Sequence, residues 1–325
     1  RIVAFLSALI MLAAALAGCR AGASDKRADL LSGGSAVAPL SPDAGFSAAY
    51  TDLALKLLSA CLEDGKNTLV SPLSVMEALA MMANGACGET LGEMERVIGG
   101  GIPVSELARY LAGFAAGGEE LSLANSLWLR EGFDIDEEFL RKCSAFQGAG
   151  AYRAPFDRHT VDDINDWVSE NTHGMIKSAV DYDTVRASEL LLCNALYFDG
   201  KWERRYSDGD ISDGYFTRES GARDEVRFMY SEEHSLLTVA GGRGFIKNYD
   251  GGNYAFVAVL PDAGTDISEF VSSLDAAALA EALKKTTAAV IDARIPEFRA
   301  EYGADLRTAL VNMGITRAFE PGEAD

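Results

Sequence analysis

Histidine is scarce in this chain, which has only three among its 325 residues: His159, His173 and His234. None of them lies in the HExxH spacing that places two imidazoles on one helix face to bind zinc. The sequence also lacks the GxSxG nucleophile elbow, the phosphate-binding Walker loop and the GxGxxG dinucleotide loop. Paired carboxylates such as Asp162 and Asp163 are most simply charges at a helix start. These absences argue against an enzyme and indicate neither a cofactor nor a metal.

Positive charge is also low, because 29 basic residues stand against 49 acidic ones and give a net charge of −20. A phosphate backbone would be repelled by such a surface, so nucleic acid is excluded as a partner. A hydrophobic content of 48% with 24% charged residues is typical of a globular chain.

The apolar run at residues 2–16 is too short for a comfortable membrane span and has the form of a signal-peptide core. It ends in Leu-Ala-Gly-Cys at residues 16–19, which resembles the bacterial lipobox. We therefore expect a lipoprotein signal peptide at 1–18, lipid attachment at Cys19 and export to the cell envelope or beyond. The alternative is an ordinary secretory signal with a chance cysteine. Residues 19–44 are rich in Ala, Gly, Ser, Pro and Asp and are expected to form a flexible tether.

Four further cysteines, Cys61, Cys87, Cys143 and Cys193, are widely separated and show no CxxC spacing. An exported protein permits disulfides, but this spacing does not determine any pairing. Cys193 lies in an apolar run, where we expect it to be a small buried hydrophobic residue.

The segment at residues 189–206 reads ELLLCNALYFDGKWERRY and contains a nearly continuous apolar run at 190–198. Such a run, ended by Asp199-Gly200, favours a strand that is covered on both faces. Asn194 is its single strongly polar interruption. We expect this amide to be buried and hydrogen-bonded, because an unpaired buried amide costs about 1–3 kcal/mol.

A second informative segment, at residues 71–85, is predicted to be a buried helix. Ser71 suits the N-cap, Pro72 the first helical position and Gly85 the C-terminal stop. Thr90 and Glu93 are predicted to form a capping box for the next helix. Other helices are expected at 45–64, 104–116, 136–146, 160–171, 267–272, 276–285 and 305–314, and strands at 67–70, 121–129, 215–217, 226–230, 244–249, 254–260 and 291–295.

Several segments, in this order, resemble the serpin family. They are SPLSVMEALAMMANGACGET at 71–90, INDWVSENTHGMI at 164–176, NALYFDGKWE at 194–203, IPEF at 295–298 and DLRTALVNMGITRAF at 305–319. The resemblance implies an α+β serpin fold, with about eight to nine helices around one large mostly antiparallel sheet and two smaller sheets. It covers residues 45–325, where we expect a serpin domain that lacks the C-terminal strands and the reactive loop.

The resemblance also implies a mechanical function. The complete form is expected to be a monomeric, covalent suicide inhibitor of a serine or cysteine endopeptidase, and its cleaved loop inserts beside the Asn194 strand. Ser71, Ser74 and Asn194 match the polar cluster where the large sheet opens, and Trp202 matches the aromatic residue where insertion begins. We expect Asn194 to form its hydrogen bonds close to Ser71 or Ser74.

Two alternatives remain open at this point: a non-inhibitory serpin that acts as a surface binding module, and a gene fragment without function. The reactive-site bond is not expected within this chain. We therefore expect the 325-residue chain not to inhibit proteases. The edge of its large sheet beside the Asn194 strand is expected to be unpaired, which favours aggregation or partial unfolding.

Overall fold

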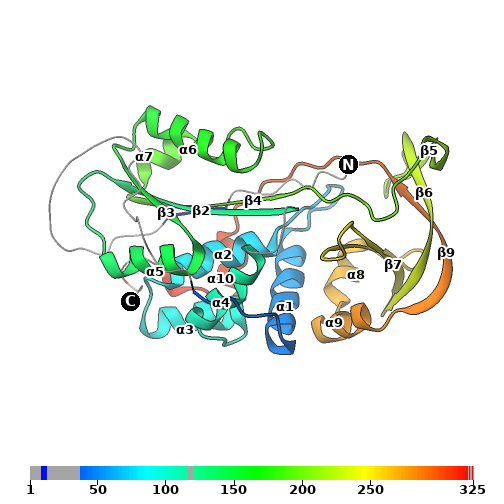
Figure 1. Cartoon of the computed structure of the whole chain (residues 1–325), viewed down its shortest axis with the longest axis horizontal. Helices are drawn as coiled ribbons and strands as arrows, with labels where there is room; N and C mark the ends of the chain where they lie inside the picture. Colours follow the sequence, from blue (N-terminus) through cyan, green and yellow to red (C-terminus); the bar gives the residue numbers. More distant parts are fainter. Residues whose placement is uncertain (1–8, 13–36, 116–119, 321, 323, 325) are drawn as a thin grey trace. The chain divides into compact units, whose positions relative to one another are not determined.

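The structure is a computed structural model that describes residues 9–12, 37–115, 120–320, 322 and 324 (Figure 1). It divides into two compact units. The first unit comprises Ala54–Leu69 and Phe198–Tyr302, and the second comprises Val70–Tyr197 with the described parts of Phe5–Leu53 and Gly303–Asp325. Cys19 and the predicted tether up to residue 36 lie outside the described residues.

The helices are α1 (Ala44–Cys61), α2 (Pro72–Ala83), α3 (Gly88–Gly99), α4 (Val104–Ala115), α5 (Glu137–Gln147), α6 (Arg158–Asn171), α7 (Tyr182–Ala187), α8 (Ile267–Ser273), α9 (Ala276–Lys284) and α10 (Arg307–Met313), with short 3-10 turns at η1 (Asp208–Asp210) and η2 (Arg317–Phe319). The strands are β1 (Leu9–Leu12), β2 (Leu121–Arg130), β3 (Gly150–Ala154), β4 (Leu190–Phe198), β5 (Ile211–Thr217), β6 (Arg223–Val239), β7 (Gly242–Asn248), β8 (Ala255–Pro261) and β9 (Thr287–Pro296).

The second unit is built on a four-stranded sheet with the order β1-β4-β2-β3. β2 and β3 run parallel. The amide of Arg130, at the end of β2, donates to the carbonyl of Glu189, just before β4. The Asn194 side chain, further along β4, donates to the carbonyl of Ala124, nearer the start of β2. The two strands therefore run antiparallel.

The outer edge of β4 carries β1, so the expectation of an unpaired edge beside Asn194 is wrong. β1 runs antiparallel to β4, with Leu9 opposite Asn194 and Leu12 opposite Leu191. β1 falls within residues 1–18, whose assignment as a signal peptide stays a prediction. The edge of β4 thus accepts a strand from a segment far away in the sequence.

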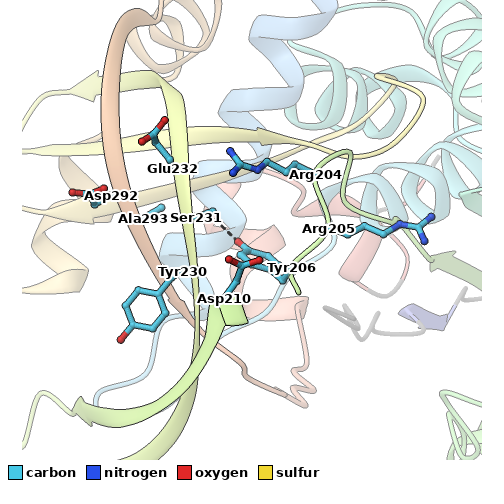
Figure 2. Close-up of a pocket in the computed structure, with 9 residues that line it drawn as sticks. All are labelled: Arg204, Arg205, Tyr206, Asp210, Tyr230, Ser231, Glu232, Asp292 and Ala293. Carbon is cyan, nitrogen blue, oxygen red and sulfur yellow. Dashed lines mark hydrogen bonds between the residues drawn. The ribbon is translucent and has the colours of Figure 1, made fainter. Parts of the chain in front are cut away.

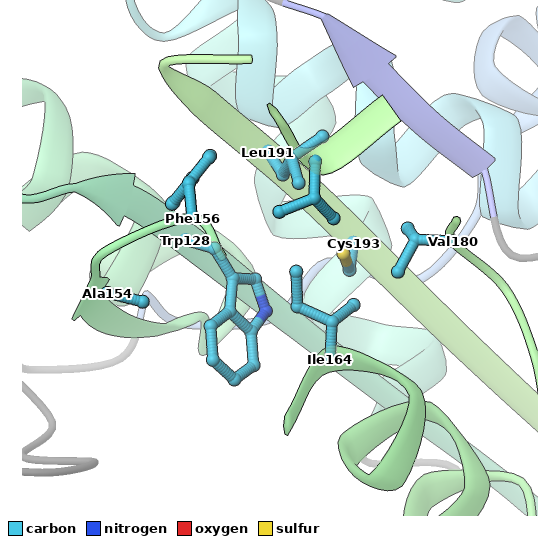
Figure 3. Close-up of a cluster of buried hydrophobic side chains, with 8 residues drawn as sticks. Trp128, Ala154, Phe156, Ile164, Val180, Leu191 and Cys193 are labelled. Carbon is cyan, nitrogen blue, oxygen red and sulfur yellow. The ribbon is translucent and has the colours of Figure 1, made fainter. Parts of the chain in front are cut away.

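Helices cover both faces of this sheet (Figure 1). α6 and α7 lie on one face, and α2, α4 and α5 lie on the other. The apolar stripe predicted on residues 160–171 packs against the sheet: Ile164 of α6 is buried with Trp128 of β2 and Cys193 of β4 (Figure 3). Val161 and Trp167 are partly buried against the same cluster. The prediction that Cys193 is a small buried hydrophobic residue is confirmed.

α2 begins as the sequence predicts and ends differently. Ser71 is the N-cap, and Pro72 is the first helical residue. The C-cap is Asn84 in a right-handed conformation, so Gly85 is not the predicted stop. A Cβ at Gly85 would lie 2.9 Å from the ring of Phe139. Glycine is required here because α5 approaches the backbone, and not because the backbone turns into the left-handed region.

The capping box predicted at Thr90 and Glu93 is wrong, because α3 begins at Gly88 with Cys87 as its N-cap. The Glu93 carboxylate instead accepts hydrogen bonds from the Thr316 amide at 2.8 Å and from the Arg317 amide at 3.0 Å. This carboxylate therefore holds η2 against α3.

The first unit is built on a five-stranded sheet. Its order is β5-β6-β7-β8, and β9 pairs with β6. β6 is 17 residues long and pairs with β5 near its start and with β7 near its end. The two smaller sheets expected from the resemblance are thus joined through one strand. The β7–β8 hairpin predicted from the sequence is confirmed.

Three local features of the structure differ from the secondary structure predicted from the sequence. Residues 67–70 were predicted to be a strand but have no regular structure. β3 and α7 were not predicted.

Cys61, Cys87, Cys143 and Cys193 are all free thiols in the part of the chain that the structure describes.

Candidate functional site

The first part of the predicted site is a serine pair at the start of α2. Ser71 donates from its Oγ to the Oγ of Ser74 at 3.0 Å and accepts from the Ser74 amide at 3.3 Å. Both side chains are buried. The pair forms because an N-cap hydroxyl faces the N3 position of its own helix. Its geometry therefore follows from the local sequence.

Asn194 is fully buried on β4 and is hydrogen-bonded, as predicted. Its partners are not the serines. The Nδ2 of Asn194 donates to Asn125 Oδ1 at 2.8 Å and, more weakly, to the carbonyl of Ala124 at 3.5 Å. Asn125 in turn donates to the carbonyl of Gln147 at 2.9 Å. The expected hydrogen-bonded cluster of Asn194 with Ser71 or Ser74 is replaced by a cross-strand amide pair between β4 and β2.

Glu77 belongs to the same region and was missed by the sequence analysis. It lies on α2, one turn after Ser74, and it is completely buried. Burial raises the pKa of its carboxyl to about 8, and a hydrogen bond with Asn125 opposes the shift only in part. The available signal was a lone acidic residue on a helix whose other residues, apart from Ser74, are apolar.

Trp202 lies in the first unit, within an aromatic cluster. Its ring stacks on Tyr249 at 4.6 Å between centroids with planes 6° apart, and Phe256 meets it edge-on at 5.7 Å. A Cβ at Gly200 would lie 2.5 Å from the ring of Tyr249. The glycine of the DGKW run therefore leaves the space that the Tyr249 ring fills.

A buried ion pair lies beside Trp202. The Nζ of Lys247 is 2.6 Å from Glu233 Oε1, and these side chains are only 3% and 11% exposed. The Lys247 ammonium also lies 4.9 Å from the ring centroid of Tyr206 and 5.5 Å from that of Trp202. The Ser231 hydroxyl donates to the same Glu233 oxygen at 2.7 Å. The cation is thus held by a carboxylate and two aromatic faces.

This network reaches a surface pocket of about 330 Å³ in the first unit (Figure 2). The pocket is lined by Arg204, Arg205, Tyr206, Asp210, Tyr230, Ser231, Glu232, Asp292 and Ala293. The hydroxyls of Tyr206 and Ser231 lie 3.2 Å apart and connect the pocket to Glu233. The exposed charges at its rim are of both signs, so the pocket does not select one ligand class.

The described residues contain no group of three or more His, Cys, Asp or Glu side chains that could hold a metal ion. None of the described helices is both long enough and apolar enough to cross a membrane. The arrangement around β4 consists of a buried strand, an amide pair that links it to β2 and the added edge strand β1.

Comparison with known proteins gives the class of this fold. The family model described as serpin (serine protease inhibitor) matches residues 48–325. The chain therefore belongs to the serpin family, which is a family of protease inhibitors and not of catalysts.

Among curated relatives, an uncharacterized serpin-like protein of Thermococcus kodakarensis is 28% identical over 79% of this chain and 62% of its own length. Antichymotrypsin-2 of Bombyx mori is 28% identical over 78% of this chain and 71% of its own length. Among solved structures, the thermophilic serpin tengpin matches in its latent state with a TM-score of 0.82 and 34% identity, over 88% of this chain and 80% of that one. Its native state matches with a TM-score of 0.81 and 34% identity, over 90% and 77%.

The cross-strand amide pair gives a first testable expectation. Replacing Asn194 with leucine should lower the free energy of unfolding by about 1–3 kcal/mol, because Asn125 Oδ1 loses its donor inside the protein. Urea denaturation measures this difference. Asn171→Leu is the matched control, since the Asn171 side-chain amide donates to the Trp167 carbonyl of its own helix. Equal losses in the two variants would contradict the role of the pair.

Proposed function

We propose that the whole protein to which this chain belongs inhibits a serine or cysteine endopeptidase by adding a strand to its sheet beside β4. The observation that carries the proposal is the β1–β4 pairing, in which the edge of β4 hydrogen-bonds with a segment distant in sequence. Because this edge accepts one additional strand, an inserted reactive loop would find the same backbone donors and acceptors there.

The chemistry of inhibition belongs to the target protease. Its hydroxyl or thiol attacks the scissile carbonyl of the reactive loop, and the amine side of the cleaved bond departs. The protease then remains attached as an ester or thioester. Insertion of the loop as a strand releases free energy stored in the native fold and displaces the attached protease before water hydrolyses the acyl bond.

In this proposal the site residues control how easily the sheet opens. Asn194 and Asn125 link β4 to β2, and the Ser71–Ser74 pair fixes the start of α2. Trp202 holds the aromatic cluster that follows β4. Tengpin, a serpin similar to this chain, has solved structures in both a native and a latent state. This supports conformational control in a serpin related to this chain.

The test is to incubate the protein, expressed to the full length of its gene, with a panel of serine and cysteine endopeptidases. We expect a protein–protease complex that survives boiling in detergent and appears on denaturing gels. A protein that is cleaved by the panel without forming such a complex would favour the alternative, a non-inhibitory serpin that acts as a surface binding module.

The protein is further proposed to be exported and anchored through lipid on Cys19, with the target protease at or outside the envelope. Removal of residues 1–18 as a signal peptide would take β1 away and leave the edge of β4 free for the inserted loop. The support is the Leu-Ala-Gly-Cys run after a short apolar core. We expect metabolic labelling with a fatty-acid analogue to mark the wild type and not Cys19→Ala. Cys87→Ala is the matched control, because Cys87 is an exposed thiol within the folded chain. Equal labelling of wild type and Cys19→Ala would rule out the anchor.

A further inference from the structure

A buried carboxyl group adjoins the contact between β4 and β2. Glu77 projects from α2 to Asn125 of β2, and Asn125 accepts the hydrogen bond from Asn194 of β4. One oxygen of Glu77, Oε2, is buried without a hydrogen-bond partner, and so is Oδ1 of Asn194. An ionised carboxylate needs several donors when it is buried, whereas a neutral carboxyl needs far fewer. The site as built therefore suits the protonated form.

No charged side chain among the described residues contributes to the shift at Glu77, whose causes are desolvation and Asn125. Titratable groups on the helices packed against α2 have hydrogen-bond partners other than Glu77. On α3, Glu93 binds residues 316 and 317, and Glu95 accepts from the Val104 amide. On α4, Arg109 donates to the Ala38 carbonyl, and on α5 the Cys143 thiol donates to the Met81 carbonyl.

The strands beside this region leave Glu77 equally without a counter-charge. Arg130 of β2 binds the carbonyl of Ser188 and the carboxylate of Glu189. Cys193 of β4 is packed in the apolar cluster on the α6 side of the sheet. β1 consists of Leu9–Leu12 and carries no titratable side chain. A negative charge on Glu77 would thus have no counter-charge, and it would gain further hydrogen-bond donors only if water entered.

We propose that Glu77 is a positioning residue whose proton keeps β4 paired with β2 at Asn194, so that losing the proton loosens β4 from β2 at this point. The neutral carboxyl stays buried against Asn125, and Asn125 holds Asn194. The ionised carboxylate is relieved only when the contact between the strands loosens and water reaches it. Alkaline conditions therefore favour the state in which β4 is loosened from β2 and water reaches Glu77.

The sign follows from the direction of the shift. Folding raises the pKa of Glu77 from 4.5 to about 8, so the closed chain keeps a proton that the opened, hydrated chain releases. The closed state is therefore most favoured below pH 4.5 and loses this advantage as the pH rises towards 8. Each pH unit within that window can change the opening equilibrium up to about tenfold.

The experiment uses the free thiol of Cys193 as the reporter, because it is buried on β4 next to Asn194. An aromatic disulfide reagent is added to the full chain at several pH values, and mass spectrometry follows labelling of Cys193 and of Cys143. Cys143 is a buried thiol on α5 and reports opening away from β4. Glu77→Gln is the matched control, since its amide has the same shape and does not titrate.

We expect the labelling rate of Cys193 in the wild type, divided by that in Glu77→Gln, to rise at least about tenfold between pH 6 and pH 8. Equal acceleration of Cys193 and Cys143 would mean that Glu77 acts only on global unfolding and would overturn the proposal. A ratio that does not change with pH would overturn it as well.

Glu77→Met provides a second neutral variant, and its Cys193 labelling should show the same weak pH dependence as that of Glu77→Gln. If neither variant folds, the ratio of Cys193 to Cys143 labelling in the wild type must still rise with pH. The inference goes beyond the proposed strand addition at the outer edge of β4 and does not depend on it. Its test contains no protease. The pH response can therefore be absent while inhibition is observed, and inhibition can be absent while the pH response is observed.

Discussion

Replacing Lys247 with methionine is expected to lower the free energy of unfolding by about 3–5 kcal/mol. The Lys247 ammonium lies 2.6 Å from Glu233 Oε1, and both side chains are almost completely covered. Without the cation, the Glu233 carboxylate stays buried and, within the part of the chain that the structure describes, keeps the Ser231 hydroxyl as its donor. The faces of Tyr206 and Trp202 lose their cation in the same step. Chemical denaturation at neutral pH measures the loss.

The double variant Lys247→Met with Glu233→Gln should recover most of this loss, because the uncompensated charge is gone. Lys285→Met is the surface control. Lys285 lies 2.9 Å from Glu281, but the two side chains are 77% and 56% exposed, and such exposed pairs contribute little. If Lys247→Met were as mild as Lys285→Met, the ion pair would not be buried in the folded chain.

The parts of the fold that the sequence predicts correctly depend on short-range patterns. The apolar run at 190–198 became β4 with the predicted bounds. Ser71 and Pro72 start α2 as predicted, because a cap and the helix it serves are adjacent in the chain. The Ser71–Ser74 hydrogen bond belongs to the same local geometry, but the sequence analysis expected these serines to bond with Asn194 instead.

The other half of the site depends on strand register, which the sequence does not display. Burial of Asn194 could be inferred from its apolar neighbours, but its partner Asn125 is set by how β2 lies against β4. Glu77 reaches the same amide from α2 and gave only a weak signal as one acid in an apolar helix. The pairing of β1 with β4 joins segments far apart in the chain, so local patterns could not reveal it.

Gly85 and Glu93 show a second reason for the errors. Each fits a local rule, a helix stop and a capping box, and each is used for a tertiary contact instead. Gly85 makes room for the ring of Phe139, and Glu93 binds the backbone of Thr316. A residue type that serves two purposes equally well is ambiguous until its neighbours in space are known.

Replacing Trp202 with alanine is expected to lower the free energy of unfolding by about 3–5 kcal/mol, as for other large-to-small substitutions of buried aromatic residues. The variant loses the stack on Tyr249 and the edge contact with Phe256, and it uncovers Lys247. Equilibrium denaturation gives the total loss. Hydrogen exchange should show faster exchange in β7 and β8, which carry Lys247 and Phe256.

Trp202→Phe and Trp167→Ala complete the test. Phenylalanine keeps a ring against Tyr249, so this variant should lose clearly less than alanine does. Trp167 on α6 is only partly buried, and its replacement should cost less and should affect exchange in α6 and not in β7. If Trp202→Ala left exchange in β7 and β8 unchanged, the aromatic cluster would not be what holds the hairpin. In that case Trp202→Ala could still fail to trap a protease while Trp202→Phe traps it. Such a result would mean that the ring acts directly on strand insertion.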